Sequence, residues 1–484
     1  MSFRKSFSVN LFWVGLGKYS NMLVQLIVTA VLARILTPND YGLIAIATVF
    51  MTFFTMLSDV GIGPAIIHNQ NLDEKDYENL HSFTVYLGVF LYVVFVAISP
   101  LISHFYNDDR LNLICLIMGV PIVFYCAQIV PLNLLYKKKN FKYIARTSII
   151  TNTIAGVTAI LYAYFIGGPI SLIVLQIVNS ILLLVIYKYK ERVRLKLIFS
   201  ISSIKKIFTY SFYQFSYNIV NYFSRNLDNL LIGKYVGLNA LGYYEKSYKL
   251  MLMPIRSITN VLTPVVLPMF AEFQDNRQYV YSKYKRLLEF VSILSFPISI
   301  FFFFAGKEII ILLFGSQWEG SVLTFKILSL SLGFQVLSST TGSIFQAIGD
   351  TKKMFVSQII NTTQMVLLLC LAIFLFKSIE SVAIAFCVEE FISFIVVFYY
   401  LFRLFDVSLA SLFRIIFPSV MASLLLFAVL FLSSYFFDVN IGHLFISFLV
   451  KGILTTCIII GSMQILHYFD FRGLVKKNQE WLNT

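Results

Sequence analysis

The sequence is poor in charged residues. Only 13% of its 484 residues are Asp, Glu, Lys or Arg, whereas 58% are hydrophobic and the mean hydropathy is +0.80. Soluble globular domains usually carry about 25% charged residues. This shortage excludes a large soluble all-α protein and indicates a polytopic membrane protein.

Paired cysteines and metal-ligand motifs are also missing. The histidines are scattered, neither C-x-x-C nor H-E-x-x-H occurs, and the five cysteines fall in apolar runs without paired spacing: Cys115, Cys126, Cys370, Cys387 and Cys457. Cysteines in such surroundings behave as small core residues rather than as disulfides or metal ligands. We therefore expect no metal site and no cofactor.

The sequence lacks a nucleotide-binding loop and a catalytic domain. The nearest match to G-x-x-x-x-G-K-[S/T], at Gly17-Lys18-Tyr19, has neither the upstream glycine nor a Ser or Thr after the lysine. The segments between apolar runs are too short to form a catalytic domain. We expect a protein that is not an enzyme and does not hydrolyse ATP.

Long apolar runs dominate what is present. A transmembrane helix needs about 20 apolar residues. Fourteen runs qualify, near 10–35, 41–68, 80–105, 111–136, 143–166, 169–189, 205–233, 241–270, 283–305, 320–348, 353–376, 380–402, 412–435 and 441–467. Because length rather than alternation defines them, they are helices and not barrel strands. The expected fold is all-α, with 14 transmembrane helices.

The basic residues predict the orientation of these helices. With the N-terminus in the cytoplasm, most of the 38 Lys and Arg residues fall in cytoplasmic segments, and the outer segments hold only Arg34, Arg110, Lys234, Lys307 and Lys377. Positive residues mark the cytoplasmic side of a membrane protein. Both termini are therefore expected in the cytoplasm, and the net charge of +14 reflects topology and not nucleic-acid binding. The basic cluster at residues 188–206 is expected to rest on anionic lipid headgroups.

Several residues recur at an offset of 200 positions. Pro64 matches Pro264, and Gly42 matches Gly242. Transporters often contain such repeats, although chance and shared helix-turn-helix chemistry are the alternative. We expect an N-terminal lobe of spans 1–6 (residues 1–200), a C-terminal lobe of spans 7–12 (201–404), and spans 13 and 14 with a cytoplasmic tail (405–484).

Basic side chains lie inside the predicted spans. A charge at the bilayer centre costs about 3 kcal/mol on insertion scales, so these side chains are expected to face a protein interior or a wet cavity. They are Lys18, Arg225, Lys246, Lys249, Arg256, Lys326 and Lys451, and they outnumber the carboxylates Asp59, Asp228, Glu245, Glu389 and Glu390. The excess of positive charge favours an anionic cargo. Lys451 is isolated and is expected to be structural.

Polar residues form stripes on three of the predicted spans. Positions three, four and seven residues apart share one helix face. The predicted substrate-binding residues are Lys18, Asn21 and Gln25 on span 1, Asn218, Asn221 and Arg225 on span 7, and Lys246, Lys249 and Arg256 on span 8. For each amide, the alternative is a hydrogen bond between helices. Asp59 and Asp228 are the candidates for carrying a coupling ion.

Three local motifs resemble those of a known family. Ala33–Gly42 is similar to the A-R-x-L-x-P-x-x-Y/F-G turn of the Wzx-type polysaccharide exporters. Asp59–Gly63 resembles their D-x-G-x-x segment, and Gln346–Lys352 resembles their Q-A-x-G-x-x-K turn. These exporters belong to the multidrug/oligosaccharidyl-lipid/polysaccharide exporter superfamily, and the colanic-acid and teichuronic-acid types are the most similar.

The resemblance implies a function. The cargo would be an undecaprenyl-pyrophosphate-linked oligosaccharide, moved across the bacterial cytoplasmic membrane by alternating access, with a proton or sodium ion as coupling partner and a polysaccharide polymerase nearby. Lys18 and Arg256 correspond to basic cavity residues of the related lipid II flippases, but a lysine at position 18 lacks the bidentate geometry of arginine. A multidrug exporter of the same superfamily is the alternative, although a cavity for cationic drugs should be net acidic. A scaffold for polymer assembly is a further alternative.

Overall fold

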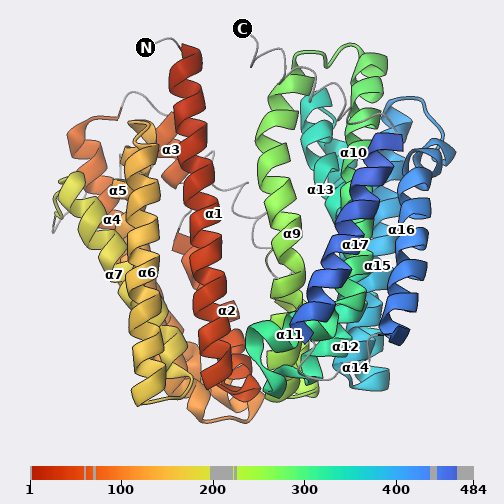
Figure 1. Cartoon of the computed structure of the whole chain (residues 1–484). Helices are drawn as coiled ribbons and strands as arrows, with labels where there is room; N and C mark the ends of the chain where they lie inside the picture. Colours follow the sequence, from red (N-terminus) through yellow and green to blue (C-terminus); the bar gives the residue numbers. More distant parts are fainter. Residues whose placement is uncertain are drawn as a thin grey trace, which may run out of the picture. The chain divides into compact units, whose positions relative to one another are not determined.

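The computed structural model describes residues 3–58, 62–68, 72–196, 222, 226–436 and 444–465. Within these residues the secondary structure is helical, with no strand. The chain forms two compact units, Met1–Gly242 and Tyr243–Thr484 (Figure 1). The three-part division predicted from the sequence stays a prediction.

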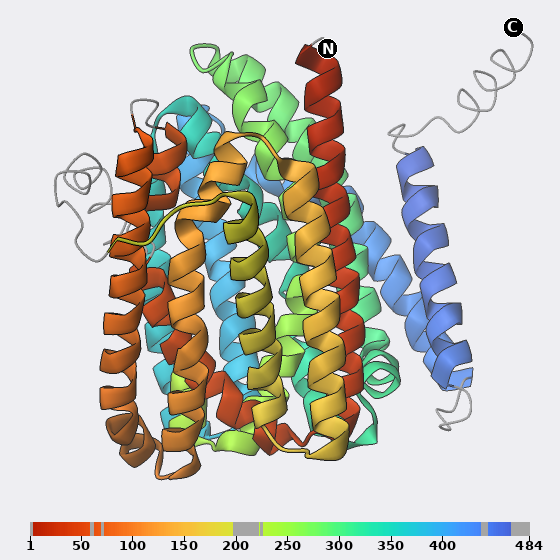
Figure 2. The ribbon, with the colours of Figure 1, turned by 90° about the vertical axis from the view of Figure 1, so that its left-hand side faces the viewer.

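The N-terminal unit is a row of long helices. Its helices are α1 (Phe3–Ile35), α2 (Pro38–Ser58), α3 (Ile62–His68), α4 (Glu74–Tyr106), α5 (Arg110–Lys137), α6 (Phe141–Phe165) and α7 (Ile170–Lys190). Packing between neighbours runs in the order α4, α5, α7, α6, α1, and Figure 2 shows these helices side by side. The predicted span 41–68 is divided between α2 and the short helix α3.

The turn between α1 and α2 explains the first sequence motif. Thr37 is the residue before α2, and its backbone N–H donates to Asp40 Oδ2 at 2.9 Å while Asp40 N–H donates to Thr37 Oγ1 at 3.3 Å. This reciprocal capping satisfies backbone groups at the helix start, where Pro38 has no N–H to lose. Arg110, the first residue of α5, donates a hydrogen bond to Asn39 Oδ1 in this turn at 3.1 Å. Its hydrogen bonds also lower the pKa of Asp108 in the preceding loop.

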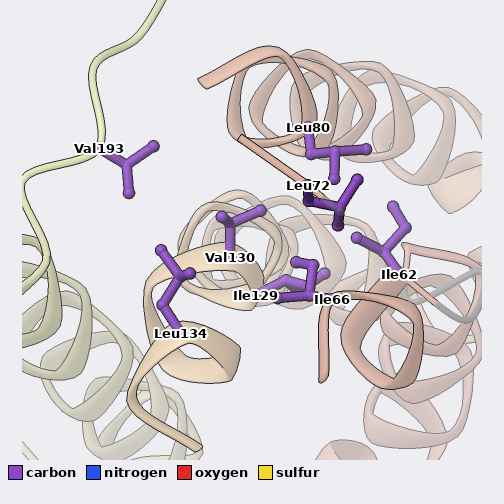
Figure 3. Packing of buried hydrophobic residues seen from close by; sticks show 8 residues of the cluster. All are labelled: Ile62, Ile66, Leu72, Leu80, Ile129, Val130, Leu134 and Val193. Atoms are coloured by element: carbon purple, nitrogen blue, oxygen red, sulfur yellow. The ribbon is translucent and has the colours of Figure 1, made fainter. Parts of the chain in front are cut away.

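An apolar cluster closes one end of the N-terminal unit. Figure 3 shows its eight side chains, Ile62, Ile66, Leu72, Leu80, Ile129, Val130, Leu134 and Val193. They come from α3, the start of α4, the end of α5 and the segment after α7. A capping box at Asp73 and Asp76 fixes the start of α4 beside them, with Asp76 N–H donating to Asp73 Oδ1 at 2.7 Å. The cluster anchors the short helix α3, which has too few residues to be stable alone.

Residues 226–235, also in the N-terminal unit, are helical as well, and the C-terminal unit contains the later helices. They are most of α9 (Leu238–Ala271), then α10 (Arg277–Phe304), α11 (Gly306–Phe314), α12 (Gly320–Ser329), α13 (Leu332–Ile348), α14 (Thr351–Phe376), α15 (Ile379–Leu404), α16 (Ala410–Phe436) and α17 (Leu444–Ile465). Packing between neighbours runs in the order α10, α13, α15, α14, while α16 and α17 pack on α10. In the N-terminal unit the equivalent helices are α4, α5, α7 and α6, which are its third, fourth, sixth and fifth predicted spans. They pack against one another in the same order. A duplication of one six-helix unit predicts this shared packing order, because both copies would fold in the same way.

One predicted span is broken. Residues 320–348 form α12 and α13, which meet at an angle of 51°. Ser329 Oγ donates to Phe325 O at 2.5 Å, and Ser331 Oγ donates to Leu328 O at 2.7 Å, so both serines bond back to carbonyl groups of α12. Serine back-bonding can bend helices, and both bonds lie at the break.

The lengths and hydropathies of the helices indicate a multi-pass membrane protein. Among the described residues, 11 helices are long and apolar enough to cross a membrane, or 12 if α12 and α13 form one span. The predicted span at 205–233 lies largely outside the described residues. The all-helical membrane fold is therefore confirmed, and the number fourteen stays a prediction.

Two glycines in the N-terminal unit pack reciprocally. A Cβ on Gly42 would lie 1.9 Å from Leu238 O, and a Cβ on Gly242 would lie 2.0 Å from Pro38 O. Pro38 and Leu238 are the first residues of α2 and α9. The backbone of the first residue of each helix therefore packs against the glycine of the other helix. The partners are related by the same 200-residue offset that the sequence shows.

Candidate functional site

The polar stripe on α1 divides in two. Lys18 and Gln25 are exposed. Asn21 instead contacts α6, where its Nδ2 donates to Ser148 Oγ at 2.8 Å and its Oδ1 accepts from Asn152 Nδ2 at 2.8 Å. The nitrogen and the oxygen of the Asn21 amide therefore both form hydrogen bonds between helices. Such bonds are the alternative to substrate binding that the sequence left open. Lys18 and Gln25 present their polar groups at the surface of the part of the unit that the structure describes.

Small residues set the rotation of α1. A Cβ on Gly17 would lie 2.8 Å from Ala145 Cβ, and a Cβ on Gly156 would lie 2.3 Å from Val28 Cγ2. Small residues let two helices approach closely in a membrane. Because Gly17 faces α6, the next residue, Lys18, is turned about 100° away from that contact. The close packing of α1 on α6 thus presents the Lys18 ammonium at the surface of the unit.

The three cations of α9 have different surroundings. Lys246 is only 4% exposed, and its Nζ lies 5.4 Å from the Phe314 ring centroid and 5.8 Å from that of Trp318. Lys249 is exposed and forms an ion pair with Glu245, one turn earlier. Arg256 is exposed as well. Lys246 therefore points into the C-terminal unit, while Lys249 and Arg256 lie on its surface.

The remaining predicted site residues are mostly undescribed. Asn218, Asn221, Arg225 and Asp59 lie outside the described residues. Asp228 is 1% exposed, and its Oδ1 accepts from the backbone N–H of Asn229 at 2.8 Å. In the part of the chain that the structure describes, no three His, Cys, Asp or Glu side chains gather as metal ligands would.

Sequence reasoning missed a buried ion pair at Lys451. Its Nζ contacts Glu308 Oε1 and donates to Phe304 O at 2.9 Å, while Ser447 Oγ donates to the same carboxylate oxygen at 2.7 Å. The Lys451 and Glu308 side chains are 6% and 1% exposed. The half-buried Lys326 adds a second cation to this cluster. The pair joins α17 to α11, a helix in a segment that the sequence predicts to be an outer loop.

The long apolar helices are typical of a multi-pass membrane protein, and several of them carry exposed cations or buried charges. Residues 31–323 of the chain match the family described as "Polysaccharide biosynthesis protein". The chain belongs to this family. The match includes the α1–α2 turn and the cations of α9, and it begins after the polar stripe of α1.

Characterised relatives of the chain come from bacteria. It is 23% identical over 346 residues to the teichuronic acid biosynthesis protein TuaB of Bacillus subtilis, covering 70% of each chain. It is 25% identical over 342 residues to the lipopolysaccharide biosynthesis protein WzxC of Escherichia coli, covering 69% of this chain and 67% of WzxC. The resemblance to polysaccharide exporters is confirmed.

Solved structures share the fold. The lipid II flippase MurJ in its inward closed conformation matches with a TM-score of 0.71 and 17% identity, covering 97% of this chain and 99% of MurJ. An inward-facing multidrug transporter of the MATE family matches with a TM-score of 0.61 and 14% identity, covering 80% and 94% of the two chains. These likenesses show that the chain shares its fold with these two transporters.

Proposed function

We propose that this protein is a flippase for an undecaprenyl-pyrophosphate-linked oligosaccharide used in polysaccharide biosynthesis. The observation that carries the proposal is the combination of a polysaccharide-biosynthesis family with the fold of a lipid flippase over 97% of the chain. The names of TuaB and WzxC support the same reading. The chain acts as a transporter and not as an enzyme, without ATP hydrolysis.

The proposal includes an architecture in the bacterial cytoplasmic membrane. Fourteen helices form two six-helix lobes, residues 1–200 and 201–404, followed by two helices and a tail in residues 405–484. Both termini lie in the cytoplasm. The shared packing order of helices within the two units and the reciprocal pairing of Gly42 and Gly242 support the duplicated lobes.

Surface cations are proposed to bind the anionic headgroup of the cargo. Lys18, Lys249 and Arg256 have exposed side chains on helices with membrane-spanning lengths. Gln25 is proposed to contact sugar hydroxyls, and Arg225, Asn218 and Asn221 complete the set from residues that are not described. The interhelical bonds of Asn21 and the aromatic contacts of Lys246 make these two the least available of the predicted residues.

Further partners remain part of the proposal. Membrane lipids surround the helices, a proton or sodium ion supplies the energy through Asp59 or Asp228, and a polysaccharide polymerase uses the exported units. Asp228 is supported only by its burial.

A leaflet-accessibility assay tests the proposed function. Purified protein is placed in liposomes with a fluorescent undecaprenyl-pyrophosphate-linked oligosaccharide, and a membrane-impermeant quencher reports the outer-leaflet fraction. We expect faster exchange than in protein-free liposomes. Arg256→Ala should reduce the exchange rate about tenfold, since it removes a charge-assisted contact, whereas Lys283→Gln, which changes an exposed lysine on α10, should leave it unchanged. Exchange no faster than in empty liposomes would contradict the proposal.

The likeness to the MATE transporter favours one alternative, a multidrug exporter. Energised vesicles loaded with a cationic dye separate the two functions. A flippase for an anionic lipid should leave dye retention unchanged, and active dye efflux would favour the alternative.

A further inference from the structure

Two cations on α6 share one indole ring. The Lys142 Nζ and the Arg146 guanidinium carbon each lie 5.1 Å from the Trp13 ring centroid, although Trp13 belongs to α1. Both basic side chains are exposed and lie one helical turn apart. Like charges at this spacing repel each other. The face of the indole attracts both and holds them in place despite that repulsion.

Neither cation has a carboxylate partner among the described residues. Other basic side chains of the same unit do: Lys138 pairs with Glu191 at 2.5 Å and Lys196 with Glu78 at 2.9 Å. Lys190 of α7 also lacks a described carboxylate partner, and it lies 5.7 Å from the ring of Tyr143 on α6. Aromatic rings therefore position these cations, and no carboxylate of the described residues compensates their charge.

The start of α6 adds to the positive potential. Its first turn has no acidic residue, and Asn140 makes no side-chain cap to the free backbone N–H groups. The N-terminal end of a helix carries a partial positive charge. Lys142, in this first turn, therefore strengthens a field that is already positive and that an anion would neutralise.

The cluster lies where three membrane-spanning helices end together. Trp13 lies near the start of the apolar run predicted at residues 10–35 of α1, Phe141 begins α6, and Lys190 ends α7. The helices α1 and α7 both pack against α6, as Figure 2 shows. Tryptophan gathers at the membrane–water interface, at the depth of lipid headgroups. Lipid phosphates are anions that lie at this depth.

We propose that Trp13, Lys142, Arg146 and Lys190 form a docking site for the diphosphate headgroup of a polyprenyl-linked cargo at the membrane surface. This inference rests on the proposed function and adds a site separate from the α9 cations. A phosphodiester such as phosphatidylglycerol carries one negative charge. Three cations that have no carboxylate partner among the described residues, held over Trp13 and Tyr143, fit the higher charge of a diphosphate better.

A binding titration tests the docking site. The full-length protein in phosphatidylcholine nanodiscs is titrated with undecaprenyl diphosphate, and in a second arm with phosphatidylglycerol. The readout is the tryptophan emission of the wild type minus that of Trp13→Phe, with Kd measured in parallel by native mass spectrometry. We expect undecaprenyl diphosphate to change the Trp13 emission and to bind more tightly than phosphatidylglycerol.

Charge-removing variants give the decisive comparison. Lys142→Gln and Arg146→Gln should each weaken diphosphate binding about tenfold, the loss of one charge-assisted contact, and should leave phosphatidylglycerol binding unchanged. The matched control is Lys283→Gln on α10, since Lys283 is an exposed lysine 5.3 Å from the Tyr279 ring. The control should bind like the wild type.

Each contrary result has a defined meaning. Equal losses for diphosphate and phosphatidylglycerol would overturn the proposal in favour of a general anionic-lipid site. Unchanged diphosphate binding in both variants, with lipid exchange intact, would overturn the docking site alone. A wild type that neither binds undecaprenyl diphosphate nor exchanges the lipid-linked glycan would overturn the proposed function as well.

Discussion

At the scale of single residues, a polar side chain in a membrane helix has two possible uses. It can bond to a neighbouring helix or remain available for a ligand, and the sequence shows the same residue type in both cases. Asn21 and Gln25 illustrate the difference, since Asn21 is bonded to Ser148 and Asn152 while Gln25 is exposed. The packing of the helices decides between the two uses, and that packing cannot be read from the sequence.

The two amides should therefore respond differently to truncation. Asn21→Ala removes two interhelical hydrogen bonds and should lower the free energy of unfolding by about 1 kcal/mol, with little effect on cargo affinity. Gln25→Ala should leave stability unchanged and weaken cargo binding. Thermal unfolding in detergent and cargo titration check both variants. Loss of cargo affinity in Asn21→Ala without loss of stability would reverse the assignment.

The buried pair of Lys451 and Glu308 makes a second prediction. Lys451→Met or Glu308→Gln alone breaks the pair, and leaving one buried charge unpaired costs about 3–5 kcal/mol. The double variant should recover most of that loss, because both fully buried charges are then removed and only the half-buried Lys326 remains charged. Reversible unfolding in denaturant measures the three free energies.

A comparison pair is available at the surface. Lys307→Met breaks the pair with Glu319, in which the two side chains are 42% and 69% exposed, and this should change stability little. If Lys451→Met has an equally small effect, the cluster at α11 and α17 does not hold these helices together.

At the scale of elements, close helix contacts depend on glycines. Gly42 and Gly242 each pack against the first residue of the other's helix, and Gly17 lets α1 approach α6. The sequence repeat identified Gly42 and Gly242 as equivalent, but not that they meet. The break between α12 and α13 was not predicted either, because serines within an apolar run give little sequence signal for a bend.

The paired glycines should be equally sensitive to substitution. Gly42→Val and Gly242→Val each force side-chain atoms against a backbone carbonyl, and overpacking of this kind costs about 1–3 kcal/mol. Both variants should lower the melting temperature and the lipid exchange rate to a similar extent. Gly461→Val is the control, since a Cβ there meets nothing within 4 Å. A strong effect at one position only would contradict the reciprocal packing.

At the scale of the whole molecule, the proposed topology places both termini on one side of the membrane. Tags at the two ends should both be cleaved by protease in inside-out vesicles, and neither in right-side-out vesicles. Cleavage of the two tags on opposite sides would require an odd number of spans. This measurement tests the even number and the orientation, which the described helices leave as predictions.

The sequence by itself determined the class of the protein. Low charge and long apolar runs specify membrane helices because the bilayer requires every backbone group to bond within its own segment. The motifs around Ala33–Gly42 were sufficient to suggest the family, because the turn needs a capping residue, a proline and a glycine at fixed positions. The excess of basic residues over carboxylates inside the predicted spans led to the prediction of an anionic cargo.

Only the tertiary structure decided what each charge and amide contacts. Lys246 proved to lie over Phe314 and Trp318, and Lys451 proved to pair with Glu308. Helix periodicity places a residue on a face, but it does not say which neighbour covers that face. That choice depends on contacts between residues far apart in the chain, and these set which cations are neutralised and which remain free to bind.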